Sequence, residues 1–155
     1  MKKQLVVMLF FLLAAGISFA QTSSKPPVKK SVTVLEKLLT GSGLPYKMAN
    51  DSLAVIPYEG ANIPSYQVLV QGISDLFIIY TSLSETLPGK IDETKYKYLL
   101  QQNDHFDVVK ISASAEDNTV YLRADLYKSA TNAALLKRVI AQVANVTNII
   151  GGDLK

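Results

Sequence analysis

Two neighbouring segments with apolar side chains at every second position form the pattern that most limits how this chain can fold. They lie within residues 106–114 and 119–127, which are separated by the acidic turn sequence Glu116-Asp117-Asn118. Because successive side chains of a strand point to opposite faces of a sheet, the pattern predicts an antiparallel hairpin with one buried face. The side chains predicted to face the core are Val109, Ile111, Ala113, Val120, Leu122, Ala124 and Leu126. Those predicted to face away from it are Lys110, Tyr121, Arg123, Asp125 and Tyr127.

The other elements follow from apolar periodicity and from turn residues. Four more strands are predicted over residues 46–49, 53–58, 66–71 and 76–80. Three helices are predicted from apolar residues spaced i, i+3 and i+4: one ended by Gly41 and Gly43, one over 93–103 and one over 130–150. The resulting order, α-β-β-β-β-α-β-β-α, predicts an α+β fold in which helices pack against an antiparallel sheet.

The boundaries of the domain are predicted from helix start and stop signals. Ser129 is a suitable N-cap for the last helix, and Gly151-Gly152 is expected to end it. Residues 31–150 are therefore predicted to form a single domain, followed by a tail over 151–155.

The strand predicted from Leu76 to Tyr80 is apolar on both faces. One face can pack on helices of the same chain, so the other needs a second layer, a second subunit or a ligand. Tyrosine combines apolar area with a polar tip, which suits a binding surface as well as ordinary sheet packing. The candidate face for a partner or for a dimer is therefore made of Phe77, Ile79, Tyr121, Arg123 and Tyr127.

The first twenty residues have the pattern of a secretory signal peptide. Lys2 and Lys3 precede an apolar run, and small residues precede the predicted cleavage between Ala20 and Gln21. A membrane anchor is the alternative, but the run is shorter than the roughly 20 apolar residues that a spanning helix needs. The protein is thus expected to be exported to the periplasm or the extracellular space, with no stable membrane anchor after cleavage. Residues 21–30, with Pro26-Pro27, are predicted to be a disordered leader.

Composition excludes several classes of function for the mature chain. Of 16 basic residues, Lys2 and Lys3 leave with the signal, so 14 remain against 13 acidic ones. A nearly neutral domain with interspersed charges is not expected to bind nucleic acid, and the one basic cluster, Lys25, Lys29 and Lys30, lies in the predicted leader. The chain has no cysteine, so disulfides, thiolate metal sites and cysteine nucleophiles are excluded, and packing alone must hold the domain together.

The residues that suggest chemistry are better explained by local structure. His105 is the single histidine, and Asp104 and Asp107 beside it fit a helix-to-strand turn better than a metal site. The acidic pairs Asp92-Glu93 and Glu116-Asp117 stand at a helix start and a turn tip, where carboxylates are favoured. No metal, no cofactor and no enzymatic activity are therefore expected.

Residues 95–127, KYKYLLQQNDHFDVVKISASAEDNTVYLRADLY, resemble the signature half of the YbjN-type sensory-regulator family, whose fold is shared with type III secretion chaperones. The similarity lies in a helix with Tyr98-Leu99-Leu100 and Asn103, then a strand, an acidic turn and the strand around Val120–Leu126. Leu44-Pro45-Tyr46 after the first helix also fits, and the resemblance extends over about residues 31–150. It implies a non-enzymatic fold whose relatives dimerise and hold extended segments of partner proteins.

Together these observations predict an exported, non-enzymatic binding module. It is expected to form a homodimer and to engage a protein or peptide partner in a chaperone-like or regulatory role. A small-molecule or lipid carrier, with its pocket between the sheet and the helices, is the alternative. An enzyme with an uncommon site around His105 is a third hypothesis, and it requires at least two carboxylates to meet that histidine in a cleft.

Overall fold

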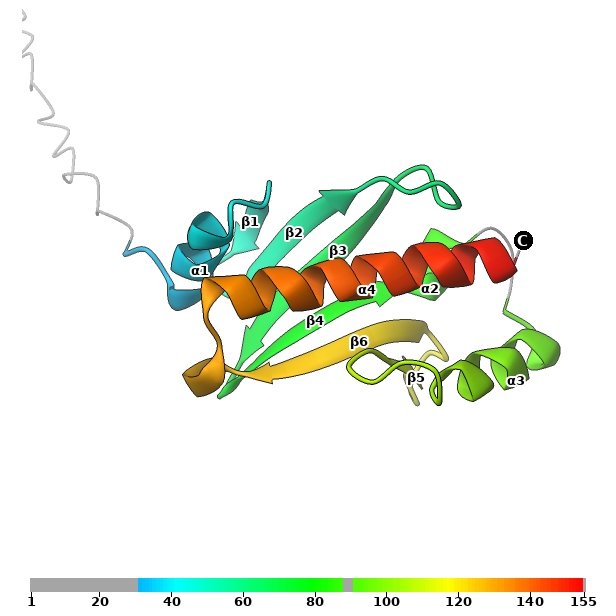
Figure 1. Cartoon of the computed structure of the whole chain (residues 1–155). Coiled ribbons are helices and arrows are strands. Elements are labelled where there is room, and N and C mark those ends of the chain that lie inside the picture. The colour runs from blue at the N-terminus through cyan, green and yellow to red at the C-terminus, as the bar shows by residue number, and fades with distance from the viewer. Residues whose placement is uncertain (1–30, 88–90, 155) are drawn as a thin grey trace, which may run out of the picture. The chain divides into compact units, whose positions relative to one another are not determined.

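A computed structural model describes residues 31–87 and 91–154 of the chain. Its six strands form one antiparallel sheet in the order β1-β2-β3-β4-β6-β5 (Figure 1). The strands are β1 Lys47–Asn50, β2 Leu53–Tyr58, β3 Tyr66–Ile73, β4 Leu76–Ser82, β5 Lys110–Ala113 and β6 Val120–Tyr127. The helices are α1 Val34–Ser42, α2 Leu83–Thr86, α3 Glu93–Gln102 and α4 Ala133–Asp153, and a 3₁₀ turn spans Lys128–Ala130. The predicted signal peptide and leader, residues 1–30, lie outside the described residues.

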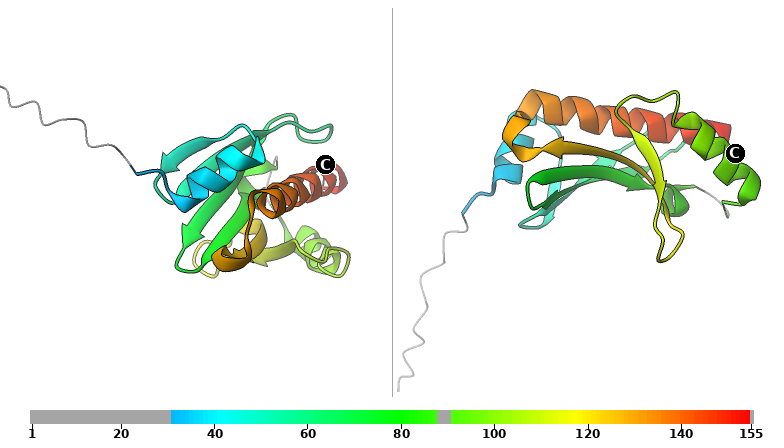
Figure 2. Two further views of the ribbon diagram at one scale, coloured as in Figure 1. Left: turned by 60° about the vertical axis from the view of Figure 1, so that its left-hand side comes forward. Right: turned by 90° about the horizontal axis from the view of Figure 1, so that it is seen from below.

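The predicted α+β fold is confirmed, and its two layers are a sheet and a helical cover on one face. Helix α4 crosses the sheet over β3, β4 and β6, and α1 packs beside it (Figure 1). In the right-hand view of Figure 2, α4 lies on one side of the sheet, and no helix covers the middle of the other side. None of the helices in residues 31–87 and 91–154 has the length and apolar character that crossing a membrane requires.

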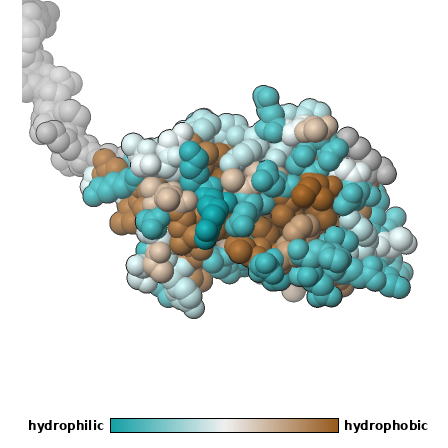
Figure 3. Space-filling model, in the orientation of Figure 1, coloured by the Kyte–Doolittle hydropathy of each residue, from teal (hydrophilic) through white to brown (hydrophobic). Residues whose placement is uncertain are grey.

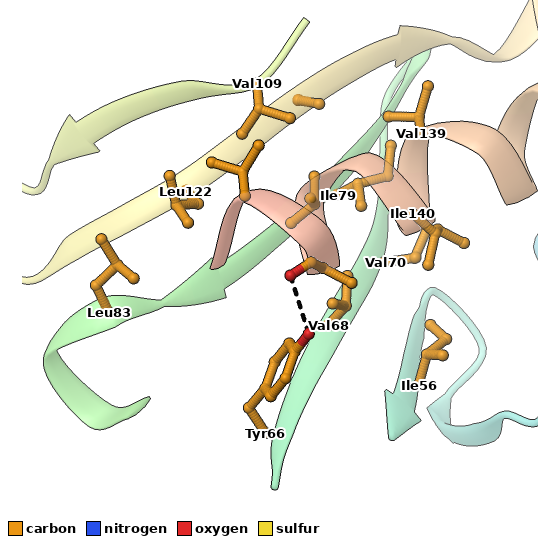
Figure 4. Packing of buried hydrophobic residues seen from close by; sticks show 14 of the residues in the cluster. Ile56, Tyr66, Val68, Val70, Ile79, Leu83, Val109, Leu122, Val139 and Ile140 are labelled. Atoms are coloured by element: carbon orange, nitrogen blue, oxygen red, sulfur yellow. Dashed lines mark hydrogen bonds between the residues drawn. The ribbon is translucent and has the colours of Figure 1, made fainter. Parts of the chain in front are cut away.

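The core lies between α4 and the covered face of the sheet (Figure 4). Helix α4 contributes an apolar stripe of Leu136, Val139, Ile140, Val143, Val146 and Ile150, all of them buried. Burial of each such side chain contributes about 1.5–3 kcal/mol, so this helix supplies a large part of the stability. A hydrogen bond of 2.9 Å from the Tyr66 hydroxyl to the Ala144 carbonyl oxygen joins β3 to α4, and Figure 4 shows it as a dashed line.

Helix α4 differs at both ends from the sequence prediction. Its N-cap is Asn132, whose side chain accepts a hydrogen bond from the Leu135 N–H at 2.8 Å, whereas Ser129 lies in the preceding 3₁₀ turn. At its other end the helix continues through Gly151 and Gly152 to Asp153, so residues 151–153 are not a tail.

The two glycines in α4 serve close packing and do not end the helix. A methyl group at Gly151 would clash with the side chain of Ile63, and one at Gly152 would clash with Asn62. The loop between β2 and β3 can therefore approach the last turn of α4. Asn148 fastens it there, because its Oδ1 accepts the Asn62 N–H at 2.8 Å.

The predicted hairpin is confirmed in its pairing but is shorter than predicted. Strand β5 begins at Lys110 and not near Phe106, and Ile111 pairs with Leu122. Ala113, which was expected to face the core, is exposed at the end of this short strand. Helix α2 was not predicted; Ser82 caps it by accepting a hydrogen bond from the Glu85 N–H.

Helix α3 is tied to the end of α4 by a hydrogen bond from the Tyr98 hydroxyl to Asp153 Oδ2. Partial burial and this carboxylate raise the pKa of Tyr98 to about 12, against roughly 10 in an unfolded chain. Below pH 10 the Tyr98 hydroxyl is protonated in both the folded and the unfolded chain. Between about pH 10 and 12 it is protonated only in the folded chain, so the contribution of this hydrogen bond to stability is lost as pH rises. The difference in unfolding free energy between the native protein and Tyr98→Phe should therefore shrink above pH 10. Urea unfolding from pH 8 to pH 12 checks this, and a constant difference would contradict it.

Candidate binding face

The sheet face opposite α4 carries an apolar strip along β4. Phe77 and Ile79 point to the core, so Leu76, Ile78 and Tyr80 point away from it, and each is partly exposed. We call these three residues the β4 strip. Within residues 31–87 and 91–154, no helix lies over it (Figure 2). The strip continues sideways through the cross-strand partners Leu69, opposite Tyr80, and Ile73, opposite Leu76.

Polar side chains border the middle of the β4 strip on both sides. On β3, Gln71 pairs with Ile78, and on β6 the residues opposite Ile78 and Tyr80 are Asp125 and Arg123. A hollow of about 310 Å³ opens among these groups. It is lined by Gln71, Ile73, Ile78, Tyr80, Ser112, Tyr121 and Arg123. An apolar floor with a few polar groups at its margin is the usual composition of a binding site.

Two tyrosines form one wall of this hollow. The rings of Tyr80 and Tyr121 meet edge to face, with centroids 5.9 Å apart. Burial, together with Tyr121 and Glu85 nearby, raises the pKa of Tyr80, so its hydroxyl stays neutral at physiological pH. A neutral phenol can both donate and accept a hydrogen bond, which allows this wall to contact polar as well as apolar groups.

Arg123, which also lines the hollow, forms an ion pair with Asp125 on the same strand. Arg123 Nε and one terminal nitrogen donate to the two oxygens of Asp125 at 2.8 and 3.0 Å. This hydrogen bonding raises the pKa of the Arg123 guanidinium. Because both side chains stay more than 40% exposed, the pair contributes little to stability. Asp125 takes two of the five N–H donors of the guanidinium, so three remain for other acceptors.

The structure corrects part of the predicted face. Phe77 and Ile79 are only 1% and 0% exposed, because they lie under α4 in the core, and they cannot form an exposed binding surface. Tyr121, Arg123 and Tyr127 do lie on the open face, as alternation predicted. Leu76, Ile78 and Tyr80 were not predicted as site residues. The signal was the two-sided apolar pattern of this strand, which shows that both faces are apolar but not which of them the helices cover.

Both edges of the sheet carry features that discourage the addition of another strand. At β5, Asn103 Oδ1 accepts the Ile111 N–H at 2.7 Å, and its Nδ2 donates to the Ile111 carbonyl oxygen at 3.2 Å. One side-chain amide thus takes both edge groups of Ile111 that a neighbouring strand would use. At the other edge, β1 has only four residues, a break in register between Met48 and Asn50, and an exposed Lys47. Short length, irregular register and lysine all protect sheet edges.

The helix side of the molecule has a second, smaller hollow of about 220 Å³. It lies between the segment 105–109 and α4, where Figure 3 shows apolar surface, and it is lined by His105, Phe106, Asp107, Val108, Val109, Gln142, Asn145 and Val146. The described part of the chain holds no group of three or more acidic, histidine or cysteine residues placed to bind a metal ion. The side chain of His105 is exposed. Its backbone N–H donates to the Gln102 carbonyl oxygen at the end of α3.

The acidic pairs have the structural roles that were predicted. Asp92 caps α3 by accepting the Lys95 N–H at 2.9 Å. Asp117 accepts the Thr119 N–H at 2.9 Å, and this bond, with a second from Ser114, lowers the pKa of Asp117. A general acid needs a raised pKa, so this carboxylate is unsuited to that role.

Comparison with known proteins shows likeness at the level of the fold. No protein-family model and no curated protein sequence matches the chain. Among solved structures, YbjN of E. coli, described as a candidate transcription regulator, has 10% identity and a TM-score of 0.54 over 79% of this chain and 93% of its own. A chain of the heterodimeric ExoU–SpcU complex of the Pseudomonas aeruginosa type III secretion system has 17% identity and a TM-score of 0.52, over 74% and 93%. The Yersinia pestis type III secretion chaperone SycH, solved with a fragment of YscM2, has 15% identity and a TM-score of 0.50, over 76% and 96%. The chain thus has the fold seen in YbjN and in type III secretion chaperones.

Proposed function

We propose that this protein is an exported, non-enzymatic binding module that docks a protein or peptide partner on the open face of its sheet. The observation that carries the proposal is the β4 strip, which is apolar and, in the described part of the chain, uncovered. Contiguous exposed apolar surface with a polar border commonly marks a protein interaction site. The hollow beside the strip adds a place for an anchoring side chain of the partner.

The structural neighbours support a role in protein binding. Two of the three were solved in complex with another protein, ExoU–SpcU as a heterodimer and SycH with a fragment of YscM2. At these identities the likeness concerns the fold alone, so the choice of partner must rest on the surface of this chain. The predicted signal peptide also favours a partner outside the cytoplasm.

Site-specific photo-crosslinking in the native cell tests the docking face. A photoreactive phenylalanine at position 80 should give adducts of discrete mass, because this position borders the hollow. The same group at position 137, exposed on α4, is the matched control and should give none. Ile78→Lys should abolish the adducts at position 80. Equal adducts at both positions would speak against a docking role for the open face.

Export is a separate part of the proposal, and the mature N-terminus tests it. Cleavage after Ala20 predicts that protein recovered outside the cytoplasm begins at Gln21. Intact mass measurement of cytoplasmic and extracytoplasmic fractions checks this. An uncleaved chain confined to the cytoplasm would contradict it.

The homodimer remains a prediction, and a second copy is one protein that could occupy the open face. Light scattering behind size exclusion gives the absolute mass of residues 21–155, and a dimer through this face should dissociate in Ile78→Lys. A carrier of small molecules or lipids remains the alternative. Native mass spectrometry after gentle extraction would count against that alternative if the protein carried no ligand.

A further inference from the structure

The β4 strip has the width of a single helix. This holds at Ile78, where the flanking residues are polar, Gln71 on β3 and Asp125 on β6, whereas towards its ends the apolar surface continues onto β3 through Leu69 and Ile73. Strands lie about 4.8 Å apart, so these borders are separated by roughly 10 Å. An α-helix with its side chains is about 10–12 Å across. A helix aligned with β4 would therefore cover the apolar strip and leave both polar borders at its sides.

On the opposite face of the sheet a single helix covers β4 together with both of its neighbouring strands. Helix α4 packs over β3, β4 and β6 and buries Phe77 and Ile79 with its apolar stripe. The alternate residues of β4 present a similar apolar row on the open face. A sheet with one covered face and one open apolar face is completed most simply by a second layer of the same kind.

Addition of a strand at an edge is disfavoured. Asn103 occupies both edge groups of Ile111 on β5, and the irregular four-residue β1 carries Lys47. At β5 a partner segment would have to displace the Asn103 amide before its backbone could pair with Ile111, and at β1 it would meet a short strand of irregular register. Docking through side chains on the open face meets no such obstacle.

A second sheet packed face to face is also disfavoured. It would cover the whole face, including Arg123 and Asp125, whose side chains are now more than 40% exposed. Removing an ion pair from water costs several kcal/mol per charge before the attraction between the two charges is regained. A helix along β4 would leave this pair at the rim, in contact with solvent.

We propose that the open face takes an amphipathic helix of a partner protein, aligned with β4; this rests on the docking role proposed above and names the partner's chemistry. The apolar residues of the helix, spaced i, i+3, i+4 and i+7, lie on Leu76, Ile78 and Tyr80. A bulky apolar side chain enters the hollow between Ile78 and Tyr121. An acidic or amide side chain on the flank of the helix accepts from the N–H groups of Arg123 that Asp125 does not take.

Two peptide display libraries test the proposal on residues 21–155. One encodes 18-residue amphipathic helices with a randomised apolar stripe, and the other encodes extended peptides of the same composition with strict apolar–polar alternation. Binders to the native protein are counter-selected on Ile78→Lys. Val108→Lys is the matched control, because Val108 is 43% exposed and lies on the helix side. Circular dichroism confirms that each variant is folded, and Arg123→Glu replaces Ile78→Lys if that variant is not.

The helix library should yield binders that lose at least about tenfold in affinity on Ile78→Lys and are unchanged on Val108→Lys. Binders from the alternating library that lose affinity on Ile78→Lys and bind the native protein at least as tightly would contradict the helical partner. They would still support docking on the open face. If no helical binder is found but the protein is a dimer that Ile78→Lys dissociates, a second copy of the chain occupies the open face and the helical partner is contradicted. If neither library yields such binders and the protein is monomeric, the helix proposal fails, and the docking role fails with it unless position 80 still gives specific crosslinks.

Discussion

Replacing Phe77 with alanine is expected to lower the free energy of unfolding by about 3–5 kcal/mol. The ring is 1% exposed and lies in the core, where its removal leaves a cavity between the sheet and α4. The ammonium group of Lys128 also lies 5.5 Å from the ring centre, and this contact is lost with it. Urea unfolding of residues 21–155 at pH 7, followed by circular dichroism, measures the change.

Tyr127→Ala is the matched control for this prediction. Tyr127 was assigned to the same candidate face as Phe77, but it is 63% exposed and belongs to the open side. Its removal should change the unfolding free energy by no more than about 0.5 kcal/mol. If Phe77→Ala were as mild as Tyr127→Ala, Phe77 would not be a core residue and the assignment of the two faces of β4 would be wrong.

These two residues show where sequence periodicity succeeds and where it stops. In β6 the apolar side chains alternate with polar ones, so the pattern itself identifies the buried face, and Leu122 and Ala124 lie in the core as predicted. In β4 both faces are apolar, so alternation divides the residues into two sets without saying which set the helices cover. That choice is made by α4, more than fifty residues away in the sequence.

The predicted end of the last helix was wrong for a similar reason. Gly151 and Gly152 read as a helix stop because glycine commonly follows the last helical turn. In the structure they continue α4, since Ile63 and Asn62 pack where side chains would otherwise stand. A close approach between segments far apart in sequence leaves no local signal that separates it from a helix end.

The protection of the β5 edge by Asn103 could not be predicted from the sequence either. Asn103 was noted as part of a family-like stretch, but its two hydrogen bonds to Ile111 depend on how the 103–109 turn folds back against the strand. An asparagine after a helix reads locally as a turn residue. Its role as a substitute for a neighbouring strand becomes visible only in three dimensions.

Asn103→Ala is therefore expected to have two effects at once. It leaves the N–H and the carbonyl oxygen of Ile111 without their partners, which should lower the unfolding free energy by about 1–3 kcal/mol. It also opens the edge of β5, because an unpaired strand edge recruits strands from other molecules. The variant should self-associate increasingly with concentration, measured by light scattering at temperatures where it remains folded.

Gln102→Ala separates these effects from a general loss in α3. It removes the neighbouring amide side chain at the last residue of the same helix and leaves the Asn103–Ile111 bonds in place. This control should stay as soluble as the native protein and lose little stability. Asn103→Asp keeps an acceptor for the Ile111 N–H but cannot donate to its carbonyl oxygen, so it should fall between the two. If Asn103→Ala lost stability without associating more than Gln102→Ala, the amide would be only a packing element of the turn, and the edge of β5 would be protected by other means.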